Sequence, residues 1–303
     1  MKKDSKSHGN KAGKPKPAAS MMVQENTELM KFLIDQLPQK NRNNIKSLLA
    51  NKQVYVDGKP IKQFNHPLIP GQEVAIRWTR IPEEKQYRGI TIVYEDMDII
   101  VVDKHAGVLS IATNNEKTQT VYNMLSRHVK IQDPKNKIFV VHRLDRETSG
   151  LMMFAKSEKI QHILQKNWSD LVSERVYIAV VEGLIEEPEG TISSYLRESK
   201  ALIVYSSQNP NNGFKAVTHY KLMKSGRNYT MLKVNLETGK KNQVRVHMQD
   251  IEHPVVGDKK YGAKTNPIGR LGLHAWVLAF RHPVNNELLH FETPVPRKFL
   301  RLF

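Results

Sequence analysis

The chain has 303 residues, enough for one large domain and a smaller one. Lys and Arg number 47 against 30 Asp and Glu, and the net charge of +17 favours a polyanionic partner, nucleic acid first and an acidic membrane surface second. The absence of cysteine excludes disulfides, thiolate nucleophiles and Cys-based zinc sites. No apolar run approaches the ~20 residues of a membrane span, and no signal-peptide core is seen, so we expect a cytoplasmic protein.

A disordered basic arm is predicted over residues 1–22. The segment is rich in Lys, Gly, Ser, Pro and Ala. Such a composition buries too little apolar surface to order a chain. The pattern leaves open whether the arm contacts nucleic acid or is only a solvated tail.

Residues 23–80 are predicted to fold as a small α+β domain. Apolar residues at helical spacing indicate two helices, at 29–37 and 45–49. A Val-Tyr-Val run enters an Asp-Gly turn at 54–59, and a second strand, 73–77, follows a Pro-Gly turn. This order of elements resembles the RNA-binding domain named for ribosomal protein S-four.

That resemblance implies that cations around the second helix bind RNA. Arg42, Lys46 and Lys52 would contact phosphates, which supplies affinity without reading the bases. The residues themselves leave a second interpretation open, in which this is any small basic α+β domain and its charges form a solvated face.

A polar, proline-containing linker is predicted at 81–89, followed by the main domain at 90–303. Two strands, 90–94 and 99–102, open this domain. Apolar residues within 121–129 then predict an amphipathic helix.

The strongest chemical signal surrounds Asp145. Two apolar runs, 138–141 and 151–155, predict buried strands on either side of a polar loop. Asp145 lies in that loop between Arg143 and Arg146, and nearby positive charge favours an ionised carboxylate. From chemistry alone Asp145 is a nucleophile, a base or a structural anchor, because Asp-x-x-Thr-Ser-Gly is also ordinary turn sequence.

The sequence His-Arg-Leu-Asp-Arg-Glu-Thr-Ser-Gly-Leu at 142–151 resembles the catalytic-loop signature of the RluA-type pseudouridine synthases. In that family the aspartate of this loop is catalytic, so the resemblance implies that role for Asp145. Arg143 and Arg146 become candidate RNA contacts. The family's Lys-Pro-Ala-Gly turn is matched at 104–107, with His105 in place of the proline.

A second match lies in the strand predicted at 175–183. It begins with a basic residue, one further residue and a tyrosine, as the family strand does. The resemblance implies that Tyr177 stacks on the target base or assists proton transfer. From the residues alone, a half-buried strand tyrosine is the preferred interpretation.

The segment 236–247 resembles the family sequence Gly-Arg-Thr-His-Gln-Ile-Arg. Gln243 and Arg245 match it, and the resemblance implies that Arg245 pairs with the catalytic aspartate. The residues before Gln243 depart from the pattern on a turn expected to meet the substrate, which bears on target choice more than on chemistry. They are Lys240, Lys241 and Asn242, and the two lysines join Gln243 as candidate RNA contacts.

Weaker matches at 253–262 and 270–275 follow in the same order. Together the matches imply an α+β fold with a mixed, mainly antiparallel, pseudouridine-synthase-like sheet and flanking helices, preceded by the small α+β domain. They imply an isomerase, an RNA pseudouridine synthase that acts on large-subunit ribosomal RNA as a monomer, with no cofactor, no metal, no membrane and no protein partner.

Three alternatives remain at this stage: a tRNA pseudouridine synthase, a non-catalytic RNA-binding or ribosome-assembly protein on the same fold, and a protein that binds acidic membranes. The discriminating residues are Asp145, Tyr177 and Arg245. A purely RNA-binding groove has no use for a carboxylate, because it repels phosphate.

Overall fold

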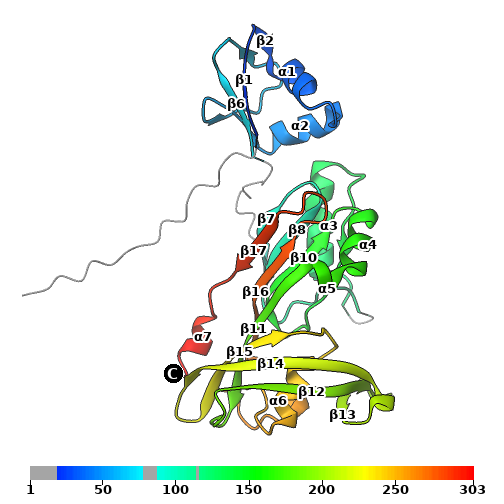
Figure 1. The fold of residues 1–303 in the computed structure, drawn as a ribbon, viewed down its shortest axis with the longest axis vertical. Coiled ribbons are helices and arrows are strands. Elements are labelled where there is room, and N and C mark those ends of the chain that lie inside the picture. Colours follow the sequence, from blue (N-terminus) through cyan, green and yellow to red (C-terminus); the bar gives the residue numbers. More distant parts are fainter. Residues whose placement is uncertain (1–18, 78–86, 114–115) are drawn as a thin grey trace, which may run out of the picture. The chain divides into compact units, whose positions relative to one another are not determined.

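The computed structural model of the chain describes residues 19–77, 87–113 and 116–303. The chain divides into two compact units, residues 1–81 and 82–303 (Figure 1). Residues 1–18 of the predicted arm and 81–86 of the predicted linker lie outside the described residues.

The predicted end of the arm at residue 22 is wrong. Residues Ala19–Met22 form strand β1, which is antiparallel to β6 (Glu73–Ile76). Met21 packs against the core of the first unit, whereas Ser20 and Met22 are exposed, and this alternation is the pattern of a half-buried strand. This strand was not predicted because its four residues directly follow a lysine-rich segment whose composition is typical of disorder.

The first unit contains two helices, α1 (Leu29–Gln36) and α2 (Arg42–Ala50). Its described strands form an antiparallel sheet in the order β1-β6-β3-β4, and β2 pairs with β5. The remaining bounds are β2 (Thr27–Glu28), β3 (Val54–Val56), β4 (Lys59–Pro60) and β5 (Pro67–Leu68).

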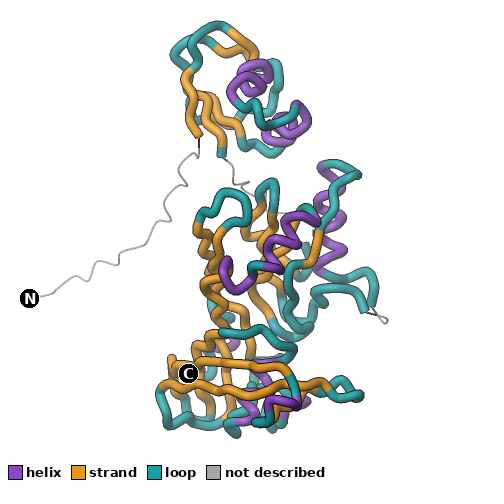
Figure 2. The backbone as a smooth tube through the Cα atoms, turned by 45° about the vertical axis from the view of Figure 1, so that its right-hand side comes forward, coloured by secondary structure: helices purple, strands orange, loops and turns teal. Residues whose placement is uncertain are grey.

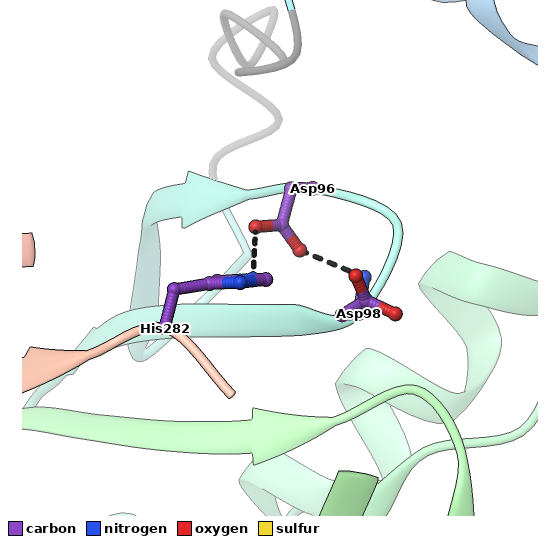
Figure 3. Close-up of side chains that lie close together, drawn as sticks. All are labelled: Asp96, Asp98 and His282. Atoms are coloured by element: carbon purple, nitrogen blue, oxygen red, sulfur yellow. Dashed lines mark hydrogen bonds and ion pairs between the residues drawn. The ribbon is translucent and has the colours of Figure 1, made fainter. Parts of the chain in front are cut away.

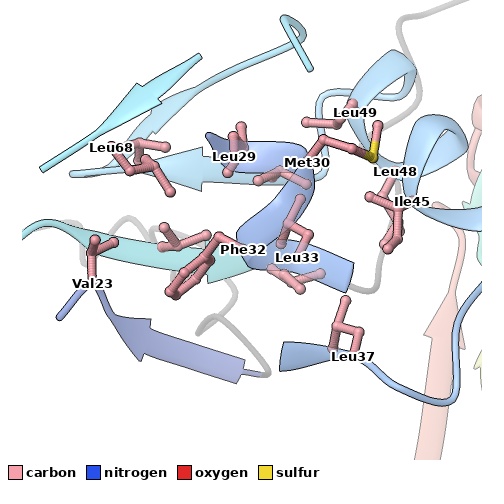
Figure 4. Close-up of a cluster of buried hydrophobic side chains, with 14 residues drawn as sticks. Val23, Leu29, Met30, Phe32, Leu33, Leu37, Ile45, Leu48, Leu49 and Leu68 are labelled. Atoms are coloured by element: carbon pink, nitrogen blue, oxygen red, sulfur yellow. The ribbon is translucent and has the colours of Figure 1, made fainter. Parts of the chain in front are cut away.

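Both helices pack their apolar faces into one core (Figure 4). Leu29 and Leu33 of α1 lie one helical turn apart and are fully buried, as is Ile45 of α2. Asn41 begins α2, because its side chain accepts a hydrogen bond from the backbone N–H of Asn44 at 2.9 Å. The predicted helices are therefore present, and the cations of α2 remain on its outer face.

The second unit is built on an 11-stranded sheet. Nine of its strands follow the order β13-β12-β14-β15-β11-β16-β10-β8-β7, while β9 pairs with β10 and β17 pairs with β16. Among the described pairs only β10 and β16 run parallel, so the predicted mixed, mainly antiparallel sheet is confirmed. The strands are β7 (Ile90–Glu95), β8 (Ile99–Lys104), β9 (Phe139–Val140), β10 (Ser149–Ala155), β11 (Val172–Glu182), β12 (Glu189–Glu198), β13 (Val204–Ser207), β14 (Phe214–Ser225), β15 (Tyr229–Leu236), β16 (Leu273–Arg281) and β17 (Leu288–Glu292).

Two helices cover opposite faces of one half of this sheet (Figure 2). Met152 of β10 packs toward α3 (Val121–Gln132), and its neighbour Met153 packs toward α4 (Glu158–Lys166). Successive strand residues point to opposite faces, so a strand covered on both sides is apolar throughout. Every residue of β10 is buried, which explains the unbroken apolar run at 151–155.

The other half of the sheet carries α6 (Gln243–Asp250), which packs Val244 and Met248 against β11 and β15. Two shorter helices complete the unit, α5 (Trp168–Leu171) and α7 (Arg297–Leu300). Among the described residues, no helix combines the length and apolarity that crossing a membrane requires.

Candidate active site

Asp145 lies in the loop that leads from β9 into β10, at the centre of the sheet. β10 begins by pairing in parallel with β16, with Gly150 opposite Ala275. Gly150 has a φ of 113°, and a Cβ at this position would lie 2.1 Å from the carbonyl oxygen of Ala275. Glycine is required here because the two backbones approach too closely for any side chain.

The residues on either side of Asp145 are held by one turn, residues 104–110. Ser110 donates to the carbonyl of Leu144 at 2.7 Å and accepts from its N–H at 3.2 Å. Beyond Asp145, the carbonyl of Arg146 accepts from Lys104 Nζ at 3.0 Å and from the N–H of Gly107 at 2.8 Å. The backbone around Asp145 is therefore fixed on both sides.

Asp145 opens onto a cavity of about 420 Å³. The cavity contains most of the predicted site residues of this unit, drawn from β11, α6 and the loops before β10 and α6. Its predicted members are Arg143, Asp145, Tyr177, Lys240, Lys241, Gln243 and Arg245.

Arg245 on α6 joins two carboxylates. Its Nη1 donates to Asp145 Oδ2 at 3.2 Å, while Nε and Nη2 donate to the two oxygens of Asp258 at 2.6 and 2.8 Å. Burial alone would lower the pKa of Arg245, but the bonds and charge of Asp258 and Asp145 raise it. The two hydrogen bonds to Asp258 fix the plane of the guanidinium group. Its Nη1 remains available to orient the Asp145 carboxylate.

Asp145 keeps an oxygen available. Its side chain is 30% exposed, and within the described chain only Oδ2 takes part in a hydrogen bond. Asp258, in contrast, is 2% exposed and has both oxygens occupied by Arg245. Of the two carboxylates, Asp145 is thus the one placed to meet a bound molecule.

Tyr177 of β11 is half-buried and lines the same cavity. Burial raises the pKa of its hydroxyl to about 12, with the Asp145 charge adding to the rise and Arg175 opposing it. The phenol therefore stays protonated near neutral pH. It can pack against a base or donate a hydrogen bond, but it is a poor proton acceptor.

The cavity residues that were not predicted as part of the site include His142, Trp168 and Arg175. The Trp168 and His142 rings lie 5.0 Å apart, and the Arg175 guanidinium lies 5.6 Å from the Trp168 ring. Burial lowers the pKa of His142 to about 3, and its Nε2 accepts from the N–H of Met153, so the ring is neutral. Trp168 carried no sequence signal, because it lies outside every motif.

The predicted RNA contact Gln243 has its polar atoms occupied within the protein. Its carbonyl accepts from Thr238 Oγ1 and the N–H of Lys240, and its amide donates to Val217 and Thr218. Gln243 is 2% exposed, and its hydrogen bonds hold the loop before α6, including the backbone of Lys240, in place.

Asn242 begins α6 in the left-handed conformation, with a φ of 56°. Asparagine adopts this conformation more readily than most residues. Its side chain accepts from Arg245 and donates to the Tyr261 hydroxyl at 2.8 Å, so it is part of the support of Arg245. Asn242 is 8% exposed and lines the Asp145 cavity, so the expectation that it meets the substrate stays a prediction. Lys240 and Lys241 remain exposed.

Arg146 lies outside the Asp145 cavity. Its side chain is 66% exposed, donates to the carbonyl of Gly107 and lines a separate cavity with His105. It does not join the other predicted contacts, because the chain turns between Asp145 and Arg146. Arg42, Lys46 and Lys52 are exposed in the first unit.

Within residues 19–77, 87–113 and 116–303, one group of side chains could be considered for a metal: Asp96, Asp98 and His282, with donor atoms within 4.8 Å of one another (Figure 3). Asp96 Oδ1 already accepts from the N–H groups of Asp98 and Ile99. Its Oδ2 accepts from Tyr94 at 2.7 Å and pairs with His282 at 3.0 Å. The cluster ties the β7–β8 turn to the end of β16 and is explained by these bonds.

Comparison with known proteins decides the family. Residues 98–250 match the family described as RNA pseudouridylate synthase. The chain is 32% identical over 289 residues to the uncharacterized RNA pseudouridine synthase YlyB of Bacillus subtilis, covering 92% of this chain and 94% of that protein. The chain belongs to the RNA pseudouridylate synthase family.

A further relative is the ribosomal large subunit pseudouridine synthase D of Escherichia coli, 31% identical over 89% of this chain and 87% of that protein. Among solved structures, human RNA pseudouridylate synthase domain containing 4 superposes with a TM-score of 0.57 at 23% identity, over 70% of this chain and 90% of that one. This last likeness supports the fold. The family's reaction converts uridine in RNA to pseudouridine, so the chain is an isomerase with an RNA substrate.

Proposed function

We propose that this pseudouridine synthase modifies uridines of large-subunit ribosomal RNA, with Asp145 as the catalytic residue. The observation that carries the assignment of Asp145 is its pairing with Arg245 at the edge of the cavity, with one carboxylate oxygen left for the substrate. The name of the Escherichia coli relative supports the choice of ribosomal RNA.

The reaction breaks the bond from ribose C1′ to uracil N1, turns the base, and joins C1′ to C5. N1 takes up a proton and C5 loses one, so the atoms balance without a donor or an oxidant. Asp145 would place negative charge beside the breaking bond, where C1′ becomes electron-deficient. Arg245 would orient that carboxylate through its hydrogen bond to Oδ2.

The proton on C5 leaves once the ring regains its conjugation, and a weak base suffices for this step. Tyr177 is a poor candidate, because its pKa is raised to about 12. The oxygen of Asp145 that Arg245 does not bind is the better acceptor. Tyr177 would instead pack against the uracil ring as it turns.

The target uridine must leave its stack before it enters the cavity, which costs a few kcal/mol. Arg143 is exposed, lines the cavity and lies two residues before Asp145 in the sequence. We propose that it contacts the flanking phosphate or fills the place of the extruded base. Loops and bulges are favoured substrates, since their bases are already partly unstacked.

The first unit is proposed to bind RNA through α2, in the manner of the domain named for ribosomal protein S-four. Arg42 and Lys46 lie on its exposed face, and Lys52 follows its end. We further propose that the protein is cytoplasmic, which its lack of cysteine supports, and that it works as a monomer.

Tritium release from C5-labelled uridine tests the proposal. Transcripts of large-subunit ribosomal RNA and bulk tRNA are incubated with the wild type, with Asp145→Asn, and with Asp170→Asn as a matched control on exposed α5. Release from ribosomal RNA by the wild type and the control, but not by Asp145→Asn, is expected. Equal release by Asp145→Asn would show that another residue carries the chemistry, and release from tRNA alone would overturn the proposed target.

A further inference from the structure

Phe214, the first residue of β14, is 71% exposed, the highest value for any large apolar side chain in the described residues. Burying a phenylalanine is worth ~1.5–3 kcal/mol, and this side chain forgoes most of that gain. Single exposed apolar residues are common and need no explanation by themselves. Phe214 differs because of where it lies and what lies against it.

The strand pattern places Phe214 on the α6 side of the sheet. Side chains two apart on a strand share a face, and Ala216 is buried in a cluster with Val246 of α6. Phe214 pairs with Leu196 of β12, which belongs to the same cluster. Phe214 nevertheless remains largely exposed.

The Phe214 ring is joined to the cavity of Asp145 by Lys240. Lys240 lines that cavity, and its Nζ lies 5.2 Å from the centre of the Phe214 ring. Gln243 fixes the backbone of Lys240 at 3.0 Å, and Lys241 pairs with Glu198 of β12. The loop before α6 is thus attached to the strands that carry Phe214, and the ring lies beside Lys240, a residue of the cavity lining.

We propose that Phe214 and Lys240 form a stacking site for a nucleotide that neighbours the target uridine in the substrate RNA. The inference rests on the proposed function of the Asp145 cavity. An exposed ring beside a lysine offers the two contacts that a single-stranded nucleotide needs, a flat face for the base and a cation for its phosphate. Gly213 precedes Phe214, and its backbone lies so close to Leu196 that a side chain would collide, so the backbone just before the ring is held against β12.

The chemistry of the surroundings favours RNA over an apolar protein partner. Lys240 lies against the ring, Lys241 is exposed in the same loop, and the chain carries a net charge of +17. A single ring beside lysines presents too little apolar area for a protein interface, which needs on the order of 1,000 Å². A nucleobase fits the ring and the charge together.

Substitution of Phe214 tests the proposal. The variants are Phe214→Tyr, which keeps the ring, Phe214→Leu, which keeps apolar bulk, and Phe214→Ala; Leu288→Ala on exposed β17 is the matched control. Initial rates and filter-binding Kd are measured with the same large-subunit ribosomal RNA transcript. Stacking on one base is worth ~1–3 kcal/mol, so Phe214→Ala should raise KM and Kd about 5- to 150-fold with kcat unchanged.

Phe214→Leu should lose nearly as much as Phe214→Ala, and Phe214→Tyr and Leu288→Ala should match the wild type. If Phe214→Leu retains wild-type affinity, the site is apolar packing and the proposal is overturned; it is overturned equally if Phe214→Ala binds as well as the wild type. Should the wild type form no pseudouridine in this RNA, the proposed target fails, and the Kd series still decides the role of Phe214.

Discussion

Asp258 binds Arg245 through both carboxylate oxygens, at 2.6 and 2.8 Å, and only the remaining Nη1 of Arg245 reaches Asp145. The position of the proposed catalytic carboxylate therefore depends on a residue that touches no substrate. Asp258 is 2% exposed. It follows the buried residues Val255 and Val256, and the N–H of Val256 donates to the carbonyl of Val180 in β11.

Asp258→Asn is expected to lower kcat about 100-fold, because the guanidinium loses its fixed plane and a misplacement of ~1 Å costs that much. RNA affinity should change little. Breaking a buried pair also lowers the free energy of unfolding by about 3 kcal/mol, so assays are run below the melting point that the variant shows. A fall in affinity with unchanged kcat would place Asp258 in RNA binding instead.

Lys104→Met tests whether the turn at 104–110 positions the catalytic loop. Lys104 Nζ donates to the carbonyls of His105, Val108 and Arg146, and removing it frees the backbone directly after Asp145. We expect kcat to fall about 10- to 100-fold with little change in KM. An unchanged kcat would show that Ser110 and Gly107 hold the loop unaided.

The effect of Lys104→Met on the free energy of unfolding should depend on pH. Burial lowers the pKa of Lys104 to about 7, against about 10.4 for an unfolded lysine. Between these values the unfolded chain binds the extra proton, so wild-type stability rises with pH. The difference in free energy of unfolding, wild type minus Lys104→Met, should increase from pH 7 to pH 10 in denaturant titrations. A flat difference would contradict the lowered pKa.

His282 predicts the opposite trend. Burial alone would lower the pKa of His282, but the bond and charge of Asp96 raise it above its usual value. The folded state then binds the proton more tightly, and its contribution is complete below about pH 6.5 and is lost as pH rises through the folded pKa. The stability difference between wild type and His282→Gln should shrink over that range, while exposed His162→Gln serves as the control.

The cations near α2 predict a salt effect. In the triple variant Arg42→Gln, Lys46→Gln and Lys52→Asn, asparagine is chosen because residue 52 has a φ of 56°. Three lost phosphate contacts at ~0.7 each should reduce the slope of log Kd against log salt by about 2. Affinity should fall alike for all RNA sequences. An unchanged slope would remove α2 from the RNA interface.

The parts of the site that the sequence predicted are local. The loop at Asp145 lies between two apolar runs, so its ends and its polar centre are visible within 20 residues or so of chain. Arg245 and its pairing with Asp145, 100 residues away, were predicted only through the family resemblance, because no local pattern links the two residues. β12 was missed because serine and threonine replace most aliphatic residues along it, leaving only Ile192 and Leu196 to mark the inner face.

Other residues could not be assigned from sequence because their role depends on a partner from another element. From the sequence alone, Asp258 is an ordinary turn residue. Its role is visible only in the folded chain, where Arg245 of α6 donates a hydrogen bond to it. Gln243 matched the family pattern and was expected to meet RNA, yet four internal hydrogen bonds occupy it. Hydrogen-bond satisfaction is a property of the packed structure, and a motif does not record it.

Gly150 has a consequence for how substrate and enzyme come together. Its backbone lies against Ala275 with no room for even a methyl group, and the loop it closes is anchored on both flanks by Ser110 and Lys104. A loop held in this way cannot travel toward a substrate. The adjustment needed for reaction must therefore come from the RNA, and sites whose nucleotides are costly to rearrange are disfavoured however well their sequence fits.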